Sequence, residues 1–475
     1  MKRKAVYILI FQLFIIHASG QKKLDSLVLK FEESTTIKQA ITAIEITDAQ
    51  TGQIVVARNN HKALTPASAL KVLTTATALE RLGARYRFET KVYTTGTIAS
   101  DGTLHGNLLI VGGGDPTLGS SYLNNTDAFP STWVNELKAR GIKKIMGTVV
   151  VDAGCYDHEP ISTKWLVEDV GNYYAPGSYG IALFDNTYRL TLQCPSASEM
   201  PAITYCLPSM EGYLTFTNQL TKGTKNNIFI EGLPAGLNRL LKGTVINGTD
   251  SIYVKGDIPN APRYMALYLR NHLASRGIEV VGNELGNTEP QLLTATLSPL
   301  LSDIIKVINF RSINLFSDHL LKQTGYEPKK EPGSGSFRAG LDAQYAFWLG
   351  KGINLSDFTL HDGSGLAPAN KISANALNKV LAYMFNKSAN KRTFMASLPK
   401  AGEEGSVARL FKKGQTSATV LLKSGSMTGV RSYSGYIIKG EKTYCITLMC
   451  NNFSAPVSAV TREISALLIE IANNL

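Results

Sequence analysis

The pattern of apolar and polar positions changes several times along this chain. Residues 41–57 alternate apolar and polar side chains on either side of the turn Ala49–Gly52, which predicts a β-hairpin. An Ala- and Leu-rich run then continues to about Leu82 and stops at Gly83, as a helix does. From about residue 88 to 290 short apolar runs are separated by turn residues, so this stretch is predicted to be rich in strands.

The last third of the chain returns to helical patterns and then to strands. Three strand-like runs, at 419–423, 431–439 and 443–450, follow a series of helical segments. The final pattern, residues 456–472, places its apolar positions on one stripe, which predicts a helix that packs against a core.

The start of the first long helix carries residues suited to chemistry. Thr65 is a suitable N-cap and Pro66 a suitable first helical residue, which places Ser68 in the first turn and Lys71 one turn later on the same face. A serine hydroxyl becomes a nucleophile when a base takes its proton, and a desolvated lysine can be that base. Ser-x-x-Lys also occurs by chance in many helices, so its interpretation depends on the rest of the chain.

Two further motifs lie in the second half. Ser312-Ile313-Asn314 opens a predicted helix, either as ordinary capping or as a hydroxyl that relays a proton beside an amide that binds a peptide carbonyl. Lys423-Ser424-Gly425 ends a predicted strand. There a lysine and a hydroxyl can hold a carboxylate, and the glycine leaves room for a substrate backbone to pass.

The N-terminus has the composition of a secretory signal. Basic residues at positions 2–4 precede an apolar run over 5–16, and the small residues Ala18 and Gly20 favour cleavage before Gln21. The apolar run is shorter than the roughly 20 residues that span a bilayer. We therefore predict a signal peptide over residues 1–20 and a mature protein that is periplasmic or extracellular.

The chain is basic, with a formal net charge of +12. Its positive charges are spread out, so we expect no nucleic-acid partner and at most a loose association with anionic membranes. Cys194 and Cys206 form a possible disulfide, and the odd number of cysteines leaves at least one unpaired. No Cys/His cluster has metal-ligand spacing, so neither a metal nor a cofactor is predicted. The five cysteines are Cys155, Cys194, Cys206, Cys445 and Cys450.

Taken together, the three motifs resemble the signature of β-lactamases and penicillin-binding proteins. Over nearly the whole mature chain the sequence resembles the class C low-molecular-mass penicillin-binding proteins, the D-alanyl-D-alanine carboxypeptidase/endopeptidase family. The segments Gly114–Leu118, Asp362–Leu366 and Leu398–Gly402 also carry this resemblance. The interval from Ser68 to Ser312, about half of the chain, fits the long insertion of this family and exceeds the interval in a single-domain β-lactamase.

The resemblance implies an α+β or α/β multidomain chain with a β-lactamase/transpeptidase-like catalytic domain, in which helices flank an antiparallel sheet. We assign residues 21–88 and 290–475 to that domain. Residues 89–289 are assigned to a large strand-rich insertion between the first and second motifs, expected to consist of two subdomains.

The resemblance also implies acyl transfer on peptidoglycan stem peptides that end in D-Ala-D-Ala. Ser68 is then the nucleophile, Lys71 accepts its proton with its charge suppressed by burial and by Lys423, and Ser312 relays that proton to the leaving nitrogen. β-Lactams mimic the D-Ala-D-Ala end and are expected to trap Ser68.

Substrate-binding roles follow from the same resemblance. Asn314 would hydrogen-bond the substrate amide, and Lys423 with Ser424 would bind the terminal carboxylate. The third motif has Ser424 where threonine is commoner, which keeps the hydroxyl. Gly425 would admit the substrate backbone.

Two more positions complete the predicted site. The backbone N–H of Ser426, with that of Ser68, would form the oxyanion hole. Asp169, with Glu168 as second candidate, would approach the amine of a diamino acid in the substrate, unless it is simply a solvated acid on a loop.

Other functions remain open at this point. A β-lactamase or esterase would use the same site but needs fast deacylation, and no Glu motif of the class A type is visible between Ser68 and Ser312. A non-catalytic cell-wall sensor or penicillin-binding module is a third alternative, against which the retention of five residues argues: Ser68, Lys71, Ser312, Asn314 and Lys423. The sequence leaves the oligomeric state open, and also the balance between carboxypeptidase and endopeptidase activity.

Overall fold

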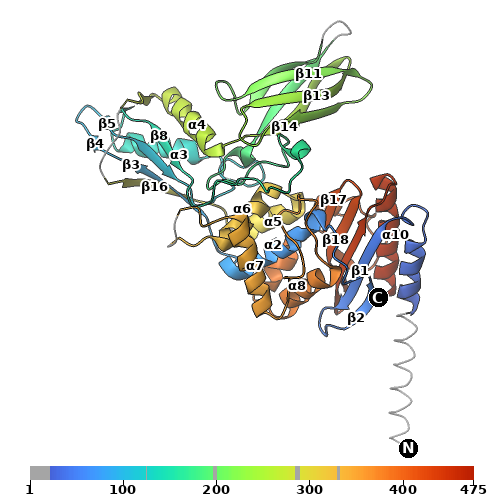
Figure 1. The fold of residues 1–475 in the computed structure, drawn as a ribbon. Coiled ribbons are helices and arrows are strands. Elements are labelled where there is room, and N and C mark those ends of the chain that lie inside the picture. Colours follow the sequence, from blue (N-terminus) through green and yellow to red (C-terminus); the bar gives the residue numbers. More distant parts are fainter. Residues whose placement is uncertain (1–21, 125, 196–199, 284–288, 329–331) are drawn as a thin grey trace, which may run out of the picture. The chain divides into compact units, whose positions relative to one another are not determined.

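The computed structural model describes residues 22–475 except 125, 196–199, 284–288 and 329–331, so the predicted signal peptide lies outside the described residues. The chain divides into two compact units, whose elements are labelled in Figure 1. Residues 313–343, which the sequence analysis assigned to the catalytic domain, pack in the strand-rich second unit. The domain boundaries near 88 and 290 stay a prediction. Unit 1 comprises Met1–Ala84, Ile305–Ser312 and Gln344–Leu475, and unit 2 comprises Arg85–Ile304 and Ile313–Ala343.

Unit 1 is built on one antiparallel sheet that draws strands from both halves of the chain. β1 pairs with β19 along its whole length, with Ile46 opposite Ile446. The hairpin and the C-terminal strands, predicted separately, meet through this one pairing (Figure 1). The order in the sheet is β17 (Thr419–Met427), β18 (Val430–Lys439), β19 (Lys442–Asn451), β1 (Ile41–Asp48) and β2 (Ile54–Arg58).

Helices pack on both faces of this sheet because side chains alternate along each strand. Ile44 and Ile46 of β1 share an apolar core with α10 (Val457–Asn474) and with helical residues 22–32. Glu45 faces the other way, and its carboxylate accepts a hydrogen bond from Asn375 Nδ2 of α8 (Ala374–Asn386) at 2.9 Å. The apolar stripe predicted for the last helix is confirmed. Its buried members include Val460, Ile464, Leu467, Leu468 and Ile471.

The described strands of unit 2 form four small sheets, with the orders β16-β3-β6-β8, β15-β7-β5-β4, β10-β9-β14 and β11-β13-β12. The strands are β3 (Glu89–Thr94), β4 (Thr97–Ile98), β5 (Thr103–His105), β6 (Leu108–Val111), β7 (Lys144–Ile145), β8 (Val149–Asp152), β9 (Thr187–Cys194), β10 (Ala202–Leu207), β11 (Thr215–Gly223), β12 (Asn227–Glu231), β13 (Asn238–Ile246), β14 (Thr249–Asp257), β15 (Glu279–Val280) and β16 (Gln291–Leu297). Helices α3 (Phe129–Ala139), α4 (Ala261–Ser275) and α6 (Asn314–Gly325) lie in this unit, and α5 (Leu301–Arg311) and α7 (Phe337–Gly350) contribute to both units.

The possible disulfide between Cys194 and Cys206 does not form, and no disulfide links cysteines of the described chain. The two residues lie on the paired strands β9 and β10, but Cys206 is opposite Leu190, several positions along β9 from Cys194. Each residue of a strand advances about 3.3 Å, so the two Cα atoms lie too far apart for an S–S bond.

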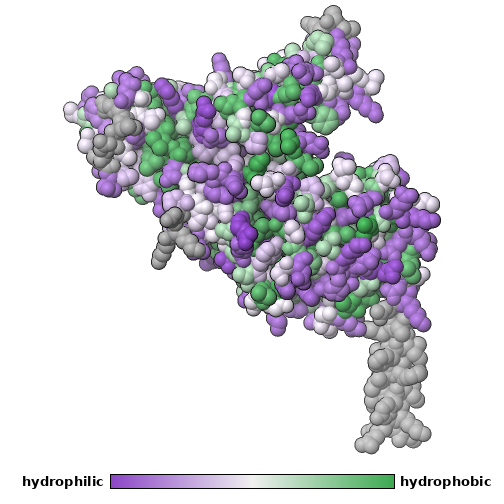
Figure 2. Space-filling model, viewed as in Figure 1, coloured by the Kyte–Doolittle hydropathy of each residue, from purple (hydrophilic) through white to green (hydrophobic). Residues whose placement is uncertain are grey.

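Across the part of the chain that the structure covers, every helix is too short or too polar to cross a membrane. Polar and apolar residues are interspersed on the face drawn in Figure 2. Such mixing is ordinary for a protein surface, since apolar atoms contribute much of it.

A buried ion pair joins two sheets of unit 2. Arg239 Nε of β13 donates to Asp257 Oδ1 of β14 at 2.8 Å, and both side chains are almost fully buried. Burial raises the pKa of Asp257, and the charge of Arg239 offsets part of that rise. The Asp257 carboxylate is therefore held in the interior by its ion pair with Arg239.

We expect Asp257→Ala to lower the free energy of unfolding by about 3–5 kcal/mol, because it leaves the Arg239 charge buried without a partner. Asp342→Ala, which removes the exposed pair with Arg338, is the matched control and should cost less than about 1 kcal/mol. Urea unfolding followed by tryptophan fluorescence measures both changes. Equal costs for the two variants would contradict this reading of the pair.

Candidate active site

Ser68 and Lys71 lie at the junction of two helical segments. Ser68 is in the 3-10 helix η1 (Ala67–Leu70), and Lys71 is the first residue of α2 (Lys71–Leu82). Lys71 Nζ donates a hydrogen bond to Ser68 Oγ at 2.9 Å, and the lysine is fully buried. The structure therefore brings the two side chains together as their spacing predicted.

The helix does not begin as predicted, however. Pro66 occupies the N-cap position, and Ala67 has a left-handed backbone with a φ of 46°. Thr65 is not the cap, because its hydroxyl donates to Pro368 O at 3.1 Å. A non-glycine residue in this region costs on the order of 1 kcal/mol or more. Ser432 Oγ, which donates to Pro66 O, helps hold this conformation around the nucleophile.

A loop of unit 1 holds Lys71 from a second direction. Lys71 Nζ also donates to the backbone carbonyl of Ser364, at 2.5 Å. One helical turn further on, Thr74 Oγ1 donates to Gly363 O at 2.7 Å. Two hydrogen bonds donated by α2 to the neighbouring carbonyls of Gly363 and Ser364 thus fasten the loop to this helix. The lysine amine therefore has a fixed position beside Ser68.

Asp362 organises this loop. Its carboxylate accepts hydrogen bonds from the backbone N–H of Gly365 at 2.8 Å and of Ala367 at 2.7 Å, and from Asn370 Nδ2 at 2.8 Å. Gly365 has a φ of 79°, and a Cβ there would lie 2.0 Å from Ala67 O. In the sequence analysis the segment Asp362–Leu366 served only as evidence of the family resemblance. In the structure it positions the Ser364 carbonyl that accepts a hydrogen bond from Lys71.

Lys423 and Ser312 form the second contact of the site. Lys423 is fully buried in β17, and its Nζ donates to Ser312 Oγ at 2.9 Å and to Ser424 O at 2.7 Å. Ser312 has a φ of 60° and does not cap α6, whose N-cap is Ile313 without a side-chain bond. The capping interpretation of this motif is wrong, and the hydroxyl instead faces the third motif.

The two buried lysines influence each other electrostatically. Burial lowers the pKa of Lys423 well below its usual value, and the positive charges of Lys71 and Arg431 lower it further. Two desolvated amines in one site cannot both hold a proton without a large cost. The site therefore favours a state with one neutral amine. An anion bound beside Lys423 would favour the charged form of that lysine, which leaves Lys71 as the neutral amine that can accept a proton from a serine.

Gly425 packs against the nucleophile segment. A Cβ at this position would lie 2.5 Å from Pro66 O and 2.8 Å from Ala69 N. The glycine is therefore required so that β17 can lie against η1. This finding replaces the prediction that Gly425 leaves room for substrate, because protein atoms already occupy that space.

Ser424 and Ser426 differ in their burial, because Ser424 is buried and Ser426 is exposed. Ser424 Oγ is 2.8 Å from Ser406 Oγ, a residue that the sequence analysis did not identify. Ser426 is exposed and pairs in register with Arg431 of β18. Ser406 carries no motif of its own, so only the fold reveals it.

In unit 2, Asn314 and Asp169 are linked through a residue that the sequence analysis missed. Asn314 Nδ2 donates to Tyr174 O at 2.8 Å, and Tyr174 Oη donates to Asp169 Oδ1 at 3.0 Å. Burial raises the pKa of Asp169, and the bond from Tyr174 lowers it in part. Burial and the neighbouring Asp169 charge raise the pKa of Tyr174, so the phenol remains a donor. Glu168 is exposed.

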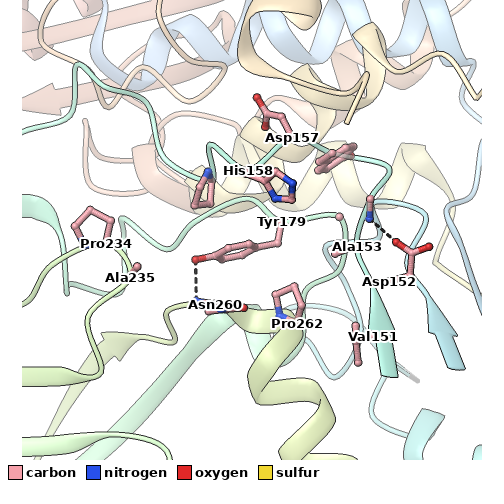
Figure 3. Close-up of a pocket in the computed structure, with 14 residues that line it drawn as sticks. Val151, Asp152, Ala153, Asp157, His158, Tyr179, Pro234, Ala235, Asn260 and Pro262 are labelled. Carbon is pink, nitrogen blue, oxygen red and sulfur yellow. Dashed lines mark hydrogen bonds between the residues drawn. The ribbon is translucent and has the colours of Figure 1, made fainter. Parts of the chain in front are cut away.

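A cavity of about 590 Å³ in unit 2 contains none of the predicted site residues (Figure 3). Two of its polar side chains are engaged within the protein. Asp157 Oδ1 pairs with Lys322 Nζ at 2.8 Å, and Tyr179 Oη accepts from Asn260 N at 2.7 Å. The first contact ties the segment around Asp157 to α6, and the second ties Tyr179 to the N-cap of α4, which are structural roles.

Comparison with known proteins supports this interpretation of the chain. The sequence profile of the D-Ala-D-Ala carboxypeptidase 3 (S13) family matches residues 21–474. A D-alanyl-D-alanine carboxypeptidase of an Actinomadura species is 28% identical over 472 residues, covering 93% of this chain and 84% of its own length. The D-alanyl-D-alanine carboxypeptidase DacB of Haemophilus influenzae is 26% identical, covering 89% of this chain and 88% of its own length.

Solved structures confirm the predicted fold class. Penicillin-binding protein 4 (dacB) of Haemophilus influenzae superimposes with a TM-score of 0.80 at 23% identity, covering 94% of this chain and 99% of that one. A second structure of that protein, in complex with a β-lactam, has a TM-score of 0.74. The multidomain, mixed α and β architecture with its antiparallel sheet is therefore the one predicted.

For Asp362→Asn we expect about a tenfold fall in kcat for acylation of Ser68 with little change in KM, because the loop that orients Lys71 loses a backbone contact. Ser364→Ala is the matched control, since Lys71 uses the backbone carbonyl of Ser364 and not its side chain. Stopped-flow acylation and thermal melting measure the two effects. A rise in KM alone, or an equal loss in both variants, would refute the positioning role.

Proposed function

Because this chain belongs to the D-Ala-D-Ala carboxypeptidase 3 (S13) family and is a serine-type D-alanyl-D-alanine carboxypeptidase, we propose that it acts on peptidoglycan stem peptides through an acyl-enzyme on Ser68. The observation that carries this proposal is the 2.9 Å hydrogen bond between the buried Lys71 amine and the Ser68 hydroxyl. A nucleophile and its base within hydrogen-bond reach, with the base held by a third group, is the arrangement that covalent catalysis requires.

The first half-reaction cleaves one bond and forms another. Ser68 Oγ bonds to the penultimate D-Ala carbonyl carbon while the neutral Lys71 amine takes the hydroxyl proton. The C–N bond then breaks, and the leaving nitrogen takes up a proton that Ser312 relays, releasing D-Ala. The Ser312 hydroxyl accepts from Lys423, which leaves its own hydrogen to donate. Water then hydrolyses the ester on Ser68.

The third motif binds the end of the substrate. Lys423 and Ser424 hold the terminal carboxylate by charge-assisted hydrogen bonds. The backbone N–H groups of Ser68 and Ser426 stabilise the oxyanion, a contribution typically worth about 3 kcal/mol in the transition state. The close packing of Gly425 against Pro66 and Ala69 supports this assignment, since it holds β17 beside the nucleophile.

Asn314 and Asp169 are proposed to bind other groups of the stem peptide. Asn314 hydrogen-bonds the substrate amide, and Asp169 receives the amine of a diamino acid. The chain of hydrogen bonds from Asn314 through Tyr174 to Asp169 supports treating them as one binding element. Tyr174 orients the carboxylate of Asp169.

The location and inhibitors follow from the substrate. Peptidoglycan lies outside the cytoplasmic membrane, so we assign residues 1–20 as a cleaved signal peptide and the mature protein to the periplasm or the extracellular space. β-Lactams present a carboxylate and an acylating carbonyl in the geometry of D-Ala-D-Ala, and we propose that they trap Ser68. The β-lactam complex of the Haemophilus influenzae protein supports this.

Ser68→Ala should abolish both D-Ala release from a stem pentapeptide and labelling by a fluorescent penicillin, because no nucleophile remains. Lys71→Ala should lower acylation by at least about 10³-fold with the fold intact, since the general base is lost. D-Ala release and gel fluorescence measure the two activities. Labelling that persists in Ser68→Ala would disprove the nucleophile, and rapid turnover of penicillin by the wild type would indicate a β-lactamase.

Asp169→Asn should raise KM about tenfold for a pentapeptide that contains a diamino acid, because a charge-assisted bond to the amine is lost. The same variant should leave KM unchanged for a pentapeptide whose side-chain amine is acetylated. Steady-state kinetics with the two peptides test this. An equal KM change for both would show that Asp169 does not read the amine.

A further inference from the structure

A second cavity in unit 2, of about 410 Å³, lies beside the three-stranded sheet β10-β9-β14. Its walls combine aromatic rings with an acid and two bases. None of its lining residues belongs to the predicted site. The residues that define its chemistry are Phe184, Asp185, Arg189, Lys255 and Tyr268.

A strained turn builds one wall of this cavity. Phe184, Asp185 and Asn186 have φ values of 53°, 60° and 47°. Left-handed backbone at a non-glycine residue costs about 1–3 kcal/mol, and here three such residues follow one another. The turn places the ring of Phe184 edge-on to Tyr268, with centroids 5.0 Å apart, and it buries the carboxylate of Asp185. Strain of this size is retained where the arrangement it enforces is needed.

The carboxylate of Asp185 is only partly satisfied. Oδ2 accepts from the backbone N–H of Ser121 at 3.1 Å and from its hydroxyl at 2.9 Å. Oδ1 is buried and has no hydrogen-bond partner within the described residues. Burial raises the pKa of Asp185, while the hydroxyls of Ser120 and Ser121 lower it in part. A buried acceptor without a donor costs about 1–3 kcal/mol, so an N–H group that reaches Oδ1 from the cavity would relieve this cost.

Two like charges face each other at the same cavity. Arg189 of β9 and Lys255 of β14 are directly opposite in the antiparallel register. Like charges in such a pair destabilise a sheet. The guanidinium carbon of Arg189 lies over the ring of Tyr253, 4.9 Å from the ring centroid. An anionic group placed between the two bases would relieve their repulsion.

We propose that this cavity binds a carboxylate-bearing peptide, with the carboxylate between Arg189 and Lys255, an amide N–H on Asp185 Oδ1, and apolar atoms against Phe184 and Tyr268. A phosphate or sulfate fits less well, because it brings neither an amide N–H for Asp185 nor apolar atoms for Phe184 and Tyr268. This inference rests on the proposed function. The polymer carries many stem peptides, each with carboxylates and amides, so the cavity holds a second stem peptide that is not being cleaved.

The test uses a stem tripeptide that lacks D-Ala-D-Ala, so that it cannot acylate Ser68, with binding measured by calorimetry on Ser68→Ala protein. Arg189→Gln combined with Lys255→Gln should weaken binding at least about tenfold, because two charge-assisted bonds are lost. Lys242→Gln combined with Arg338→Gln removes the same charge elsewhere and should leave binding unchanged. The tripeptide with its carboxylates amidated should bind the unaltered site at least about tenfold more weakly.

Asp185→Asn isolates the acceptor. Asparagine tolerates left-handed backbone, and its oxygen can keep the bonds to Ser121, so the fold should persist while an N–H group replaces the acceptor. Tripeptide affinity should fall about tenfold, with thermal stability nearly unchanged. Equal tripeptide affinity in the wild-type site and in both variants would overturn the proposal.

Catalysis separates this inference from the proposed function. In enzyme that retains Ser68, the combined Arg189→Gln and Lys255→Gln substitutions should leave hydrolysis of a soluble pentapeptide unchanged. The same substitutions should slow the digestion of intact peptidoglycan. Unchanged digestion of intact peptidoglycan would overturn the role of a second stem peptide. Variant-dependent tripeptide binding without any pentapeptide hydrolysis would support the cavity while refuting the proposed function.

Discussion

The burial of two lysine side chains in one site is the constraint around which unit 1 is organised. Lys71 and Lys423 are both fully buried, and removing an ammonium group from water is expensive unless it is hydrogen-bonded or neutral. The structure supplies acceptors from four places: the Ser68 and Ser312 hydroxyls and the carbonyls of Ser364 and Ser424. The same acceptors place the lysines beside the two serines. The hydrogen bonds that satisfy the buried amines therefore also assemble the site.

Bringing these groups together depends on backbone positions that have little freedom. Ala67 and Ser312 both have left-handed backbone, and each carries or precedes a serine of the site. Gly365 and Gly425 allow backbone to approach where a side chain would collide with the Ala67, Pro66 or Ala69 segment. The backbone strain and the close backbone contacts at these positions are tolerated because the sheet and the flanking helices of unit 1 form a large, stabilising core.

Unit 2 uses its own devices. A buried Arg239–Asp257 pair joins two of its sheets, Tyr174 joins Asn314 to Asp169, and the turn at Phe184–Asn186 places a buried acid at the wall of a cavity. Of these features, the bond from Asn314 to Tyr174 joins residues far apart in the sequence.

The sequence by itself determined the periodic elements and the candidate reactive residues. The hairpin, the C-terminal strands and the stripe of α10 follow from local periodicity, and Ser68 with Lys71 follows from helical spacing. Only the tertiary structure decided that Ser364, Asp362 and Tyr174 belong to the site, that Gly425 serves packing, and that Cys194 and Cys206 stay apart. The reason is physical: these outcomes depend on strand register and on backbone contacts between distant segments, which carry no local signature in the sequence.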